Sequence, residues 1–182
     1  MSKNLYALFQ SRFPADLSSP FIMEADGKSL SYDRLEAHTS KMAGALISLG
    51  TAPGDRVAVQ VEKTTEAVVL YLACLRVGAV YLPLNTAYTP DELNYFLGDA
   101  TPHIMVCSPT KHKMLVAIAE KNSVAHLLTL NTDGTGSLMS AYDTASPISE
   151  IADVAGDDIA AILYTSGTTG RSKGAMLTHD NL

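Results

Sequence analysis

Residues 159–174 read IAAILYTSGTTGRSKG, an apolar run followed at once by glycines, hydroxyl side chains and two cations. The run 159–163 is almost wholly apolar and predicts a buried strand. The glycines after it let backbone N–H groups approach an anion, and Arg171 and Lys173 supply charge suited to phosphate oxygens. No other Lys or Arg follows Lys121, so the local positive charge is concentrated here. We interpret this strand and loop as a polyphosphate-binding element.

Two other interpretations compete with this one. A cluster of Gly, Ser and Thr is often a flexible linker, but linkers rarely run from an apolar strand into another apolar run, here residues 175–177. The P-loop of NTPases requires the order G-x-x-x-x-G-K-[ST]. This loop fails that pattern, because Ser172 precedes Lys173 and Gly174 follows it. The stretch therefore indicates a nucleotide-phosphate loop of another kind.

The stretch resembles the phosphate-loop signature of the adenylate-forming enzymes: acyl-CoA synthetases, peptide-synthetase adenylation domains and luciferases. Their pattern is T-S-G-[ST]-T-G-x-P-K-G, and residues 165–174 match it except at Ser172, where the family usually has Pro. Proline would fix one backbone angle, so its absence loosens the loop slightly and removes no phosphate-binding group. Residues 30–35 (LSYDRL) and 75–84 (LRVGAVYLPL) resemble two further motifs of the family, in the family's order.

This resemblance implies an ATP-dependent acid–thiol ligase. In such enzymes a carboxylate attacks the α-phosphorus of ATP to give an acyl-adenylate and pyrophosphate, and the thiol of coenzyme A then displaces AMP. It implies ATP, Mg²⁺ and coenzyme A (as a substrate), with Lys173 as the catalytic residue and no metal ligand in this chain. Arg171 either contributes to phosphate binding or faces solvent. The nucleotide-binding residues implied are Thr165, Ser166, Gly167, Thr168, Thr169, Gly170, Arg171 and Lys173.

A narrower similarity points to the substrate. Residues 62–73, 81–89 and 171–173, the last including the missing Pro, look like the corresponding parts of malonyl-CoA synthetases. They imply a malonate-like carboxylic acid as the small-molecule partner, although no residue visibly recognises a dicarboxylate. Three alternatives stay open: a ligase for another acid or for a carrier protein, a noncatalytic nucleotide-binding module, and an α/β domain that binds phosphate incidentally.

The composition limits the classes of function. The chain has 182 residues, 47% of them hydrophobic, which is enough for one core of ordinary domain size. A formal net charge of −6 without a long basic patch argues against nucleic-acid binding. No apolar run approaches the roughly 18 residues needed to span a bilayer, so we expect no membrane span. The N-terminus lacks the charged-then-apolar pattern of a signal peptide.

The cysteines and histidines suggest no site of their own. Cys74 and Cys107 each lie in an apolar pattern, so we expect buried free thiols and a reduced, cytoplasmic setting. The five histidines show no paired metal-ligand spacing, and no zinc site is predicted. His179 follows the loop closely, but ordinary packing explains it without a function. No G-x-S-x-G elbow supports a hydrolase triad.

Helical and strand patterns alternate along the chain, which favours an α/β fold with a mostly parallel sheet flanked by helices. Helices are predicted at 4–12, from Ser31 to Gly50, from Thr64 or Thr65 to Val77 before Gly78, after the capping box 89–92, and at 111–121. Strands are predicted at 21–25 and 29–30 as a hairpin, and at 56–61, 80–84, 103–107, 126–130 and 159–163.

The last fifty residues carry weaker patterns. Residues 131–136 are turn material, and the acidic stretch 143–158 is expected to wrap the surface, to be mobile, and to return the chain to the sheet. Residues 178–181 offer helix caps. The family's later motifs are absent, so we expect residues 1–182 to be the N-terminal part of the large AMP-binding domain, ending just after the phosphate loop. We expect this chain alone to be inactive.

Overall fold

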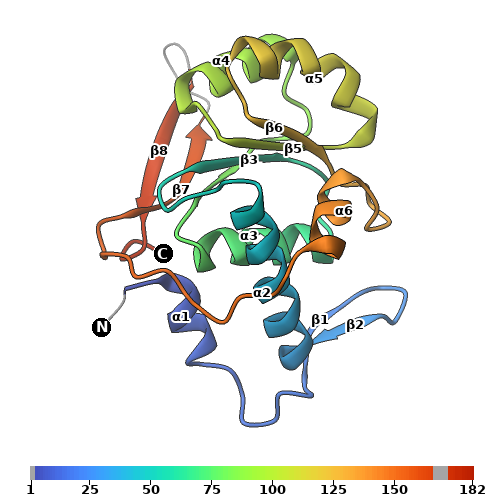
Figure 1. Cartoon of the computed structure of the whole chain (residues 1–182), viewed down its shortest axis with the longest axis vertical. Coiled ribbons are helices and arrows are strands. Elements are labelled where there is room, and N and C mark those ends of the chain that lie inside the picture. The colour runs from blue at the N-terminus through green and yellow to red at the C-terminus, as the bar shows by residue number, and fades with distance from the viewer. Residues whose placement is uncertain (1–2, 166–171) are drawn as a thin grey trace.

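The computed structural model describes residues 3–165 and 172–182 (Figure 1). The helices are α1 (Leu5–Gln10), α2 (Tyr32–Ser48), α3 (Thr65–Arg76), α4 (Pro90–Ala100), α5 (Pro109–Lys121) and α6 (Ser137–Thr144). The strands are β1 (Pro20–Met23), β2 (Ser29–Ser31), β3 (Arg56–Gln60), β4 (Val80–Pro83), β5 (Ile104–Cys107), β6 (His126–Thr129), β7 (Ile159–Thr165) and β8 (Lys173–Thr178). Within these residues no helix has the length and apolarity to cross a membrane.

Most of the strands form one sheet, in the order β6-β5-β3-β4-β7-β8. The first five in that order pair in parallel, and β8 pairs antiparallel with β7. β1 and β2 make the predicted hairpin, separate from this sheet. The predicted α/β fold with a mostly parallel sheet is therefore confirmed, and the apolar run 175–177 is the middle of an edge strand.

Helices cover both faces of the sheet (Figure 1). On one face, α4 and α5 close a core that contains Leu82, Phe96 and Met105. On the other face, α1, α2, α3 and α6 close a larger core that contains Val59 and Leu70. Because consecutive residues of a strand point to opposite faces, strands buried on both sides are nearly continuous apolar runs, as in β5.

The signals that start and stop helices act as predicted. Thr89 and Glu92 form the capping box of α4, each side chain accepting a hydrogen bond from the other residue's backbone N–H. The Thr64 side chain caps α3. Gly50 and Gly78, which follow α2 and α3, have φ angles of 84° and 72°, a conformation that favours glycine. α5 begins at Pro109, two residues before the predicted start, where proline suits a first helical turn.

One helix of the C-terminal part was not identified from the sequence. α6 forms between the turn at 131–136 and the acidic stretch, because Leu138 is buried in the core and Tyr142 bonds to His38 of α2. Residues 178–181 offer helix caps in the sequence. The chain forms a turn there, since the N–H groups of His179 and Asp180 donate to the backbone carbonyls of residues 158 and 156.

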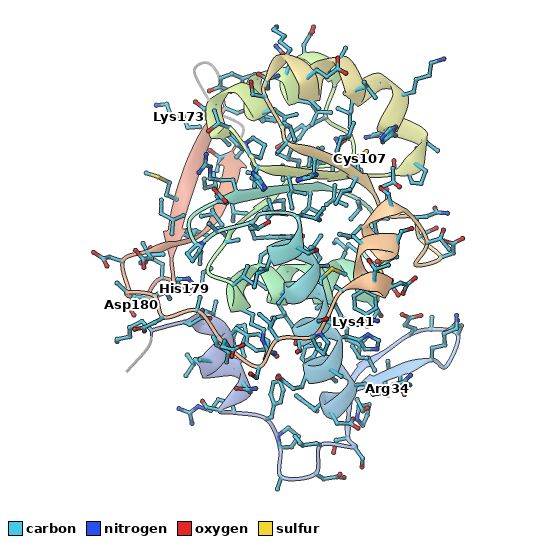
Figure 2. The ribbon with its side chains drawn as sticks, in the orientation of Figure 1. Arg34, Lys41, Cys107, Lys173, His179 and Asp180 are labelled. Atoms are coloured by element: carbon cyan, nitrogen blue, oxygen red, sulfur yellow. The ribbon has the colours of Figure 1, made fainter. Side chains whose placement is uncertain are left out.

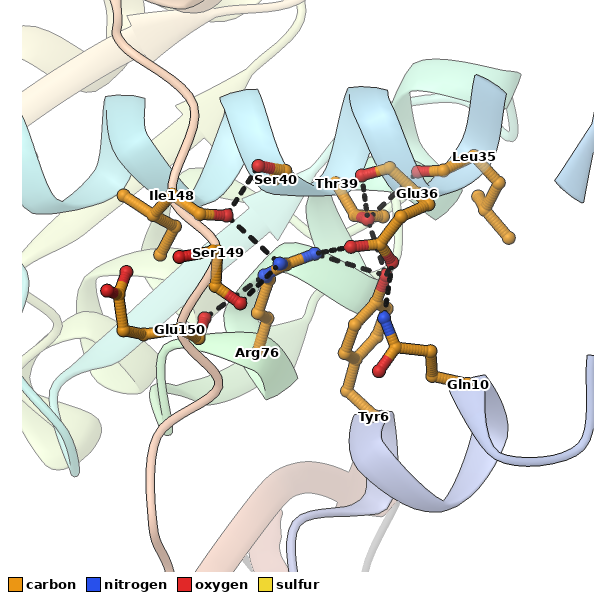
Figure 3. A network of polar contacts seen from close by, with 10 residues as sticks. All are labelled: Tyr6, Gln10, Leu35, Glu36, Thr39, Ser40, Arg76, Ile148, Ser149 and Glu150. Carbon is orange, nitrogen blue, oxygen red and sulfur yellow. Dashed lines mark hydrogen bonds and ion pairs between the residues drawn. The ribbon is translucent and has the colours of Figure 1, made fainter. Parts of the chain in front are cut away.

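The stretch after α6 wraps the surface, as expected, and leads into β7. Its backbone is fixed by one buried cation, because the Arg76 guanidinium donates to the carbonyl oxygens of Ile148, Ser149 and Glu150 (Figure 3). Ser40 of α2 also donates to the Ile148 carbonyl. These contacts argue against the mobility that the sequence suggested for this stretch.

Candidate phosphate-binding site

The β7–β8 hairpin carries the candidate site. β7 runs parallel to β4 and continues to Thr165, two residues beyond the predicted strand. Lys173 begins β8 directly opposite, and the Thr165 hydroxyl lies 3.5 Å from the Lys173 carbonyl oxygen. Thr165 and Lys173 are therefore neighbours at the carboxyl end of a parallel strand. Ligands of open α/β sheets bind at this edge.

The structure brings together the two predicted site residues that it describes. Thr165 and Lys173 are both exposed at this end of the hairpin. Within residues 3–165 and 172–182, the Lys173 ammonium has no carboxylate partner, so its charge is available to an anion. The other predicted residues lie outside the described residues: Ser166, Gly167, Thr168, Thr169, Gly170 and Arg171.

Packing explains why position 174 is a glycine. A Cβ atom there would lie 2.9 Å from a methyl carbon of Ile162 and 3.5 Å from the ring of Tyr164. Gly174 is the register partner of Tyr164, so its lack of a side chain leaves room for that ring beside the hairpin. This glycine therefore sets the spacing of the two strands immediately beside Lys173.

α4 supports the hairpin on one side. The Tyr164 hydroxyl donates to the Asp99 carboxylate at 2.6 Å, and the Tyr95 hydroxyl donates to the Ser172 carbonyl oxygen at 2.9 Å. The ring centroids of Phe96 and Tyr164 are 4.3 Å apart. Burial, with help from Asp99, raises the pKa of Tyr164 above its usual value, so this hydroxyl stays protonated and can donate.

The sequence interpretation did not identify Tyr95 and Asp99. Their spacing carried a partial signal, because residues four apart share one face of a helix. It did not reveal which strand that face meets, since the contacts join residues 77 and 65 positions apart in the chain.

On the opposite side of the hairpin, an apolar groove of about 360 Å³ lies between α3 and the sheet. Tyr71 and Tyr81 meet there edge to face, with ring centroids 5.0 Å apart. Leu163 and Leu177 line the groove from β7 and β8. Burial raises the pKa of both tyrosines, so their hydroxyl groups stay neutral and serve packing.

The remaining reactive side chains play structural parts. Cys74 and Cys107 are buried free thiols, as predicted, and burial raises the pKa of Cys107 to about 11. His179 is buried and directly follows β8, so it lies at the far end of the strand from Lys173 (Figure 2). Its Nδ1 accepts a hydrogen bond from the backbone N–H of Leu5. Across residues 3–165 and 172–182, no group of three His, Cys, Asp or Glu side chains is arranged to hold a metal ion.

A sheet of this topology between two helical layers, with a Gly- and Thr-rich stretch after a parallel strand, is the architecture of the N-terminal part of an adenylate-forming enzyme's large domain. The chain belongs to the AMP-binding enzyme family, whose family model matches residues 11–182.

Solved relatives share both fold and sequence. The apo structure of MatB from Rhodopseudomonas palustris superimposes with a TM-score of 0.94 at 50% identity, over 100% of this chain and 36% of that one. The ATP-bound structure of the same protein superimposes with a TM-score of 0.93 at 51% identity, over 100% of this chain and 36% of that one. The oxalate–CoA ligase of Arabidopsis thaliana is 34% identical over 88% of this chain and 32% of its own length. The chain thus spans about a third of the length of these relatives.

Proposed function

We propose that the protein is an AMP-forming acid–thiol ligase that converts malonate to malonyl-CoA through an acyl-adenylate, and that residues 165–173 bind the phosphates of ATP. The observation that carries this proposal is the pairing of Thr165 with Lys173, an ammonium without a carboxylate partner among the described residues, at the carboxyl end of β7. The ATP-bound relative, 51% identical over the whole of this chain, supports ATP as the nucleotide.

In the proposed reaction, a carboxylate oxygen of the acid attacks the α-phosphorus, and the bond to the pyrophosphate oxygen breaks. Negative charge accumulates on the leaving pyrophosphate. Lys173 would neutralise that charge at the β- and γ-phosphates, and the Thr165 hydroxyl would donate to a phosphate oxygen. The remaining rate enhancement comes from holding ATP in line with the acid, because the first step depends mainly on alignment of the reacting groups.

Mg²⁺ would accompany ATP and offset charge on its phosphates. The described residues contain no acidic cluster that fits it, so we derive no step through the metal. Coenzyme A is the proposed acceptor of the acyl group. The two buried free thiols support a reducing, cytoplasmic location.

Malonate is proposed because residues 62–73, 81–89 and 171–173 resemble malonyl-CoA synthetases. Other acids remain competitors, since related proteins are named for oxalate and for medium-chain fatty acids. We further propose that residues 1–182 form the N-terminal part of a longer AMP-binding domain and do not catalyse adenylation alone. The chain's coverage of about a third of its relatives supports this proposal.

The test is ATP–pyrophosphate exchange by the full-length protein with malonate, methylmalonate, acetate or a medium-chain acid. Exchange reports adenylate formation before any thiol enters. Malonate-dependent exchange is expected, and Lys173→Ala should lower it by about 100-fold, as for loss of one group that stabilises transition-state charge. Lys121→Ala, which removes an exposed ammonium in the last turn of α5, is the matched control.

Three results would contradict the proposal in different ways. Exchange with another acid would overturn malonate and keep the mechanism. Exchange unaffected by Lys173→Ala would remove the proposed role of this lysine. ATP binding without exchange for any acid would favour the noncatalytic module.

A further inference from the structure

One helix contacts both arms of the β7–β8 hairpin. Asp99 accepts a hydrogen bond from Tyr164, the residue before Thr165, and Tyr95 donates one to the carbonyl of Ser172, the residue before Lys173. The two α4 residues are four positions apart and share a helix face. α4 therefore bonds to the residue before each of the two described site residues, through the side chain of Tyr164 and the backbone carbonyl of Ser172.

Packed rings hold these hydroxyl groups in place. Phe96 is buried in the core of α4 and α5, and its ring centroid lies 4.3 Å from that of Tyr164 and 5.5 Å from that of Tyr95. The helix itself is fixed by its capping box and by buried Leu93 and Leu97. A donor carried on a rigid element positions its acceptor better than one carried on a loop.

The arm that carries Lys173 needs such support. Among the described strands, β8 lies at the edge of the sheet and pairs with β7 alone. Ser172 has no ring to fix its φ angle, unlike the Pro that usually occupies this position in the family's loop pattern. Any shift of the Ser172 carbonyl passes directly to Lys173, the next residue.

We propose that Tyr95, Asp99 and Tyr164 form an α4 brace, a set of positioning residues that aligns Lys173 with the phosphates of ATP. The hydrogen bond from Tyr95 to Ser172 takes over the restraint that proline would supply. This inference rests on the proposed function of the hairpin and adds the part of the chain that orients it.

The brace is tested in the full-length protein with Tyr95→Phe, which keeps the ring and removes the hydroxyl, and with the double variant Tyr95→Phe/Asp99→Ala. Tyr142→Phe is the matched control, because it removes a tyrosine hydroxyl that bonds to His38 on the opposite face of the sheet. The measured quantities are KM for ATP, KM for the acid and kcat in pyrophosphate exchange, together with the melting temperature.

Tyr95→Phe should raise KM for ATP by about fivefold, the equivalent of one net hydrogen bond, and the double variant should raise it further. KM for the acid and the melting temperature should stay close to those of Tyr142→Phe. A purely structural role would lower the melting temperature and leave KM for ATP unchanged. Introducing Ser172→Pro into Tyr95→Phe should restore KM for ATP, because the ring replaces the lost restraint.

The outcomes separate this inference from the proposed function. No exchange by the unmodified protein would remove the proposed function. Exchange that Lys173→Ala abolishes, with the double variant indistinguishable from Tyr142→Phe, would overturn the brace alone. A raised KM that Ser172→Pro fails to restore would overturn the role assigned to the Tyr95–Ser172 bond.

Discussion

The guanidinium of Arg76 and the carboxylate of Glu36 form an ion pair of 2.8 Å in which the Arg76 side chain is only 1% exposed. Arg76 also donates to three consecutive backbone carbonyls of residues 148–150 (Figure 3). Tyr6 of α1 donates to the same carboxylate. One buried cation therefore joins α1, α2 and α3 to the stretch that leads into β7.

Arg76→Met should destabilise the protein by about 3 kcal/mol, because removing the buried guanidinium leaves the half-buried Glu36 carboxylate and the carbonyl oxygens without that donor. Methionine retains most of the packing. The measurement is urea unfolding at pH 7. Arg34→Met, an exposed arginine of α2, is the control and should change stability by less than about 0.5 kcal/mol. Equal stabilities for the two variants would contradict the structural importance of Arg76.

The stability contributed by Glu36 should depend on pH. Although partial burial raises the pKa of Glu36, hydrogen bonds from Tyr6 and Arg76 outweigh it and hold that pKa below the usual 4.5. The folded state therefore favours the charged form, and the contribution is complete above pH 4.5 and lost as pH falls through the lower folded value.

Glu36→Gln removes this titration. The variant should be less stable than the unmodified protein at pH 7, and the difference in unfolding free energy should narrow as pH falls from 4.5 towards 3. Glu120→Gln, on the exposed face of α5, is the control and should change the unfolding free energy at pH 7 by less than about 0.5 kcal/mol. A difference that stays constant over this range would show that the carboxylate is not stabilised by its partners.

His179 should show a pH dependence in the same direction, because this buried base also has a lowered pKa in the folded state. Burial lowers the pKa of His179 below the usual 6.5, while nearby Asp158 and Asp180 act in the other direction. The neutral ring is required because Nδ1 accepts the Leu5 N–H. Its contribution is complete above pH 6.5 and decreases as pH falls below that value.

His179→Asn supplies an acceptor oxygen near the position of Nδ1 and does not titrate. Between pH 8 and pH 5.5, the melting temperature of the unmodified protein should fall further than that of His179→Asn. Parallel decreases in the two proteins would mean that protonation of His179 does not weaken the fold.

The sequence predicts the features that depend on neighbouring residues, and it misses those that depend on residues far apart in the chain. Local patterns predicted the capping box at Thr89 and the strand that leads to Thr165, because neighbouring residues determine both. They missed α6, whose buried Leu138 matters only once the core exists.

The sequence also missed the contacts of Arg76. This residue lies within a motif that marked the family resemblance, yet its three carbonyl partners are 72 to 74 positions away along the chain. The brace at Tyr95 has the same character, since a tyrosine beside Phe96 looks like another core residue until β8 is placed next to it. Periodicity and capping rules contain no information about such pairs.

Replacing Gly44, in the C-terminal half of α2, by alanine has two effects of opposite sign on stability. Alanine is the better helix former by about 1 kcal/mol, so helix propensity alone predicts that Gly44→Ala is stabilising. A Cβ at this position, however, would lie 1.9 Å from the carbonyl oxygen of Ser146. Two residues further on, the Ile148 carbonyl oxygen accepts hydrogen bonds from Ser40 and Arg76, which limits how far the Ser146 backbone can move away.

The clash should therefore prevail, and Gly44→Ala should lower the unfolding free energy by about 2 kcal/mol, as overpacking does. Gly98→Ala in α4 is the comparison, because its Cβ would meet the end of the Asn122 side chain at 2.9 Å and no backbone atom of another segment within 4 Å. Unfolding in urea measures both variants, and Gly98→Ala should change stability by less than about 1 kcal/mol. If Gly44→Ala proved as stable as the unmodified protein, the stretch after α6 would not lie against α2 as closely as this structure places it.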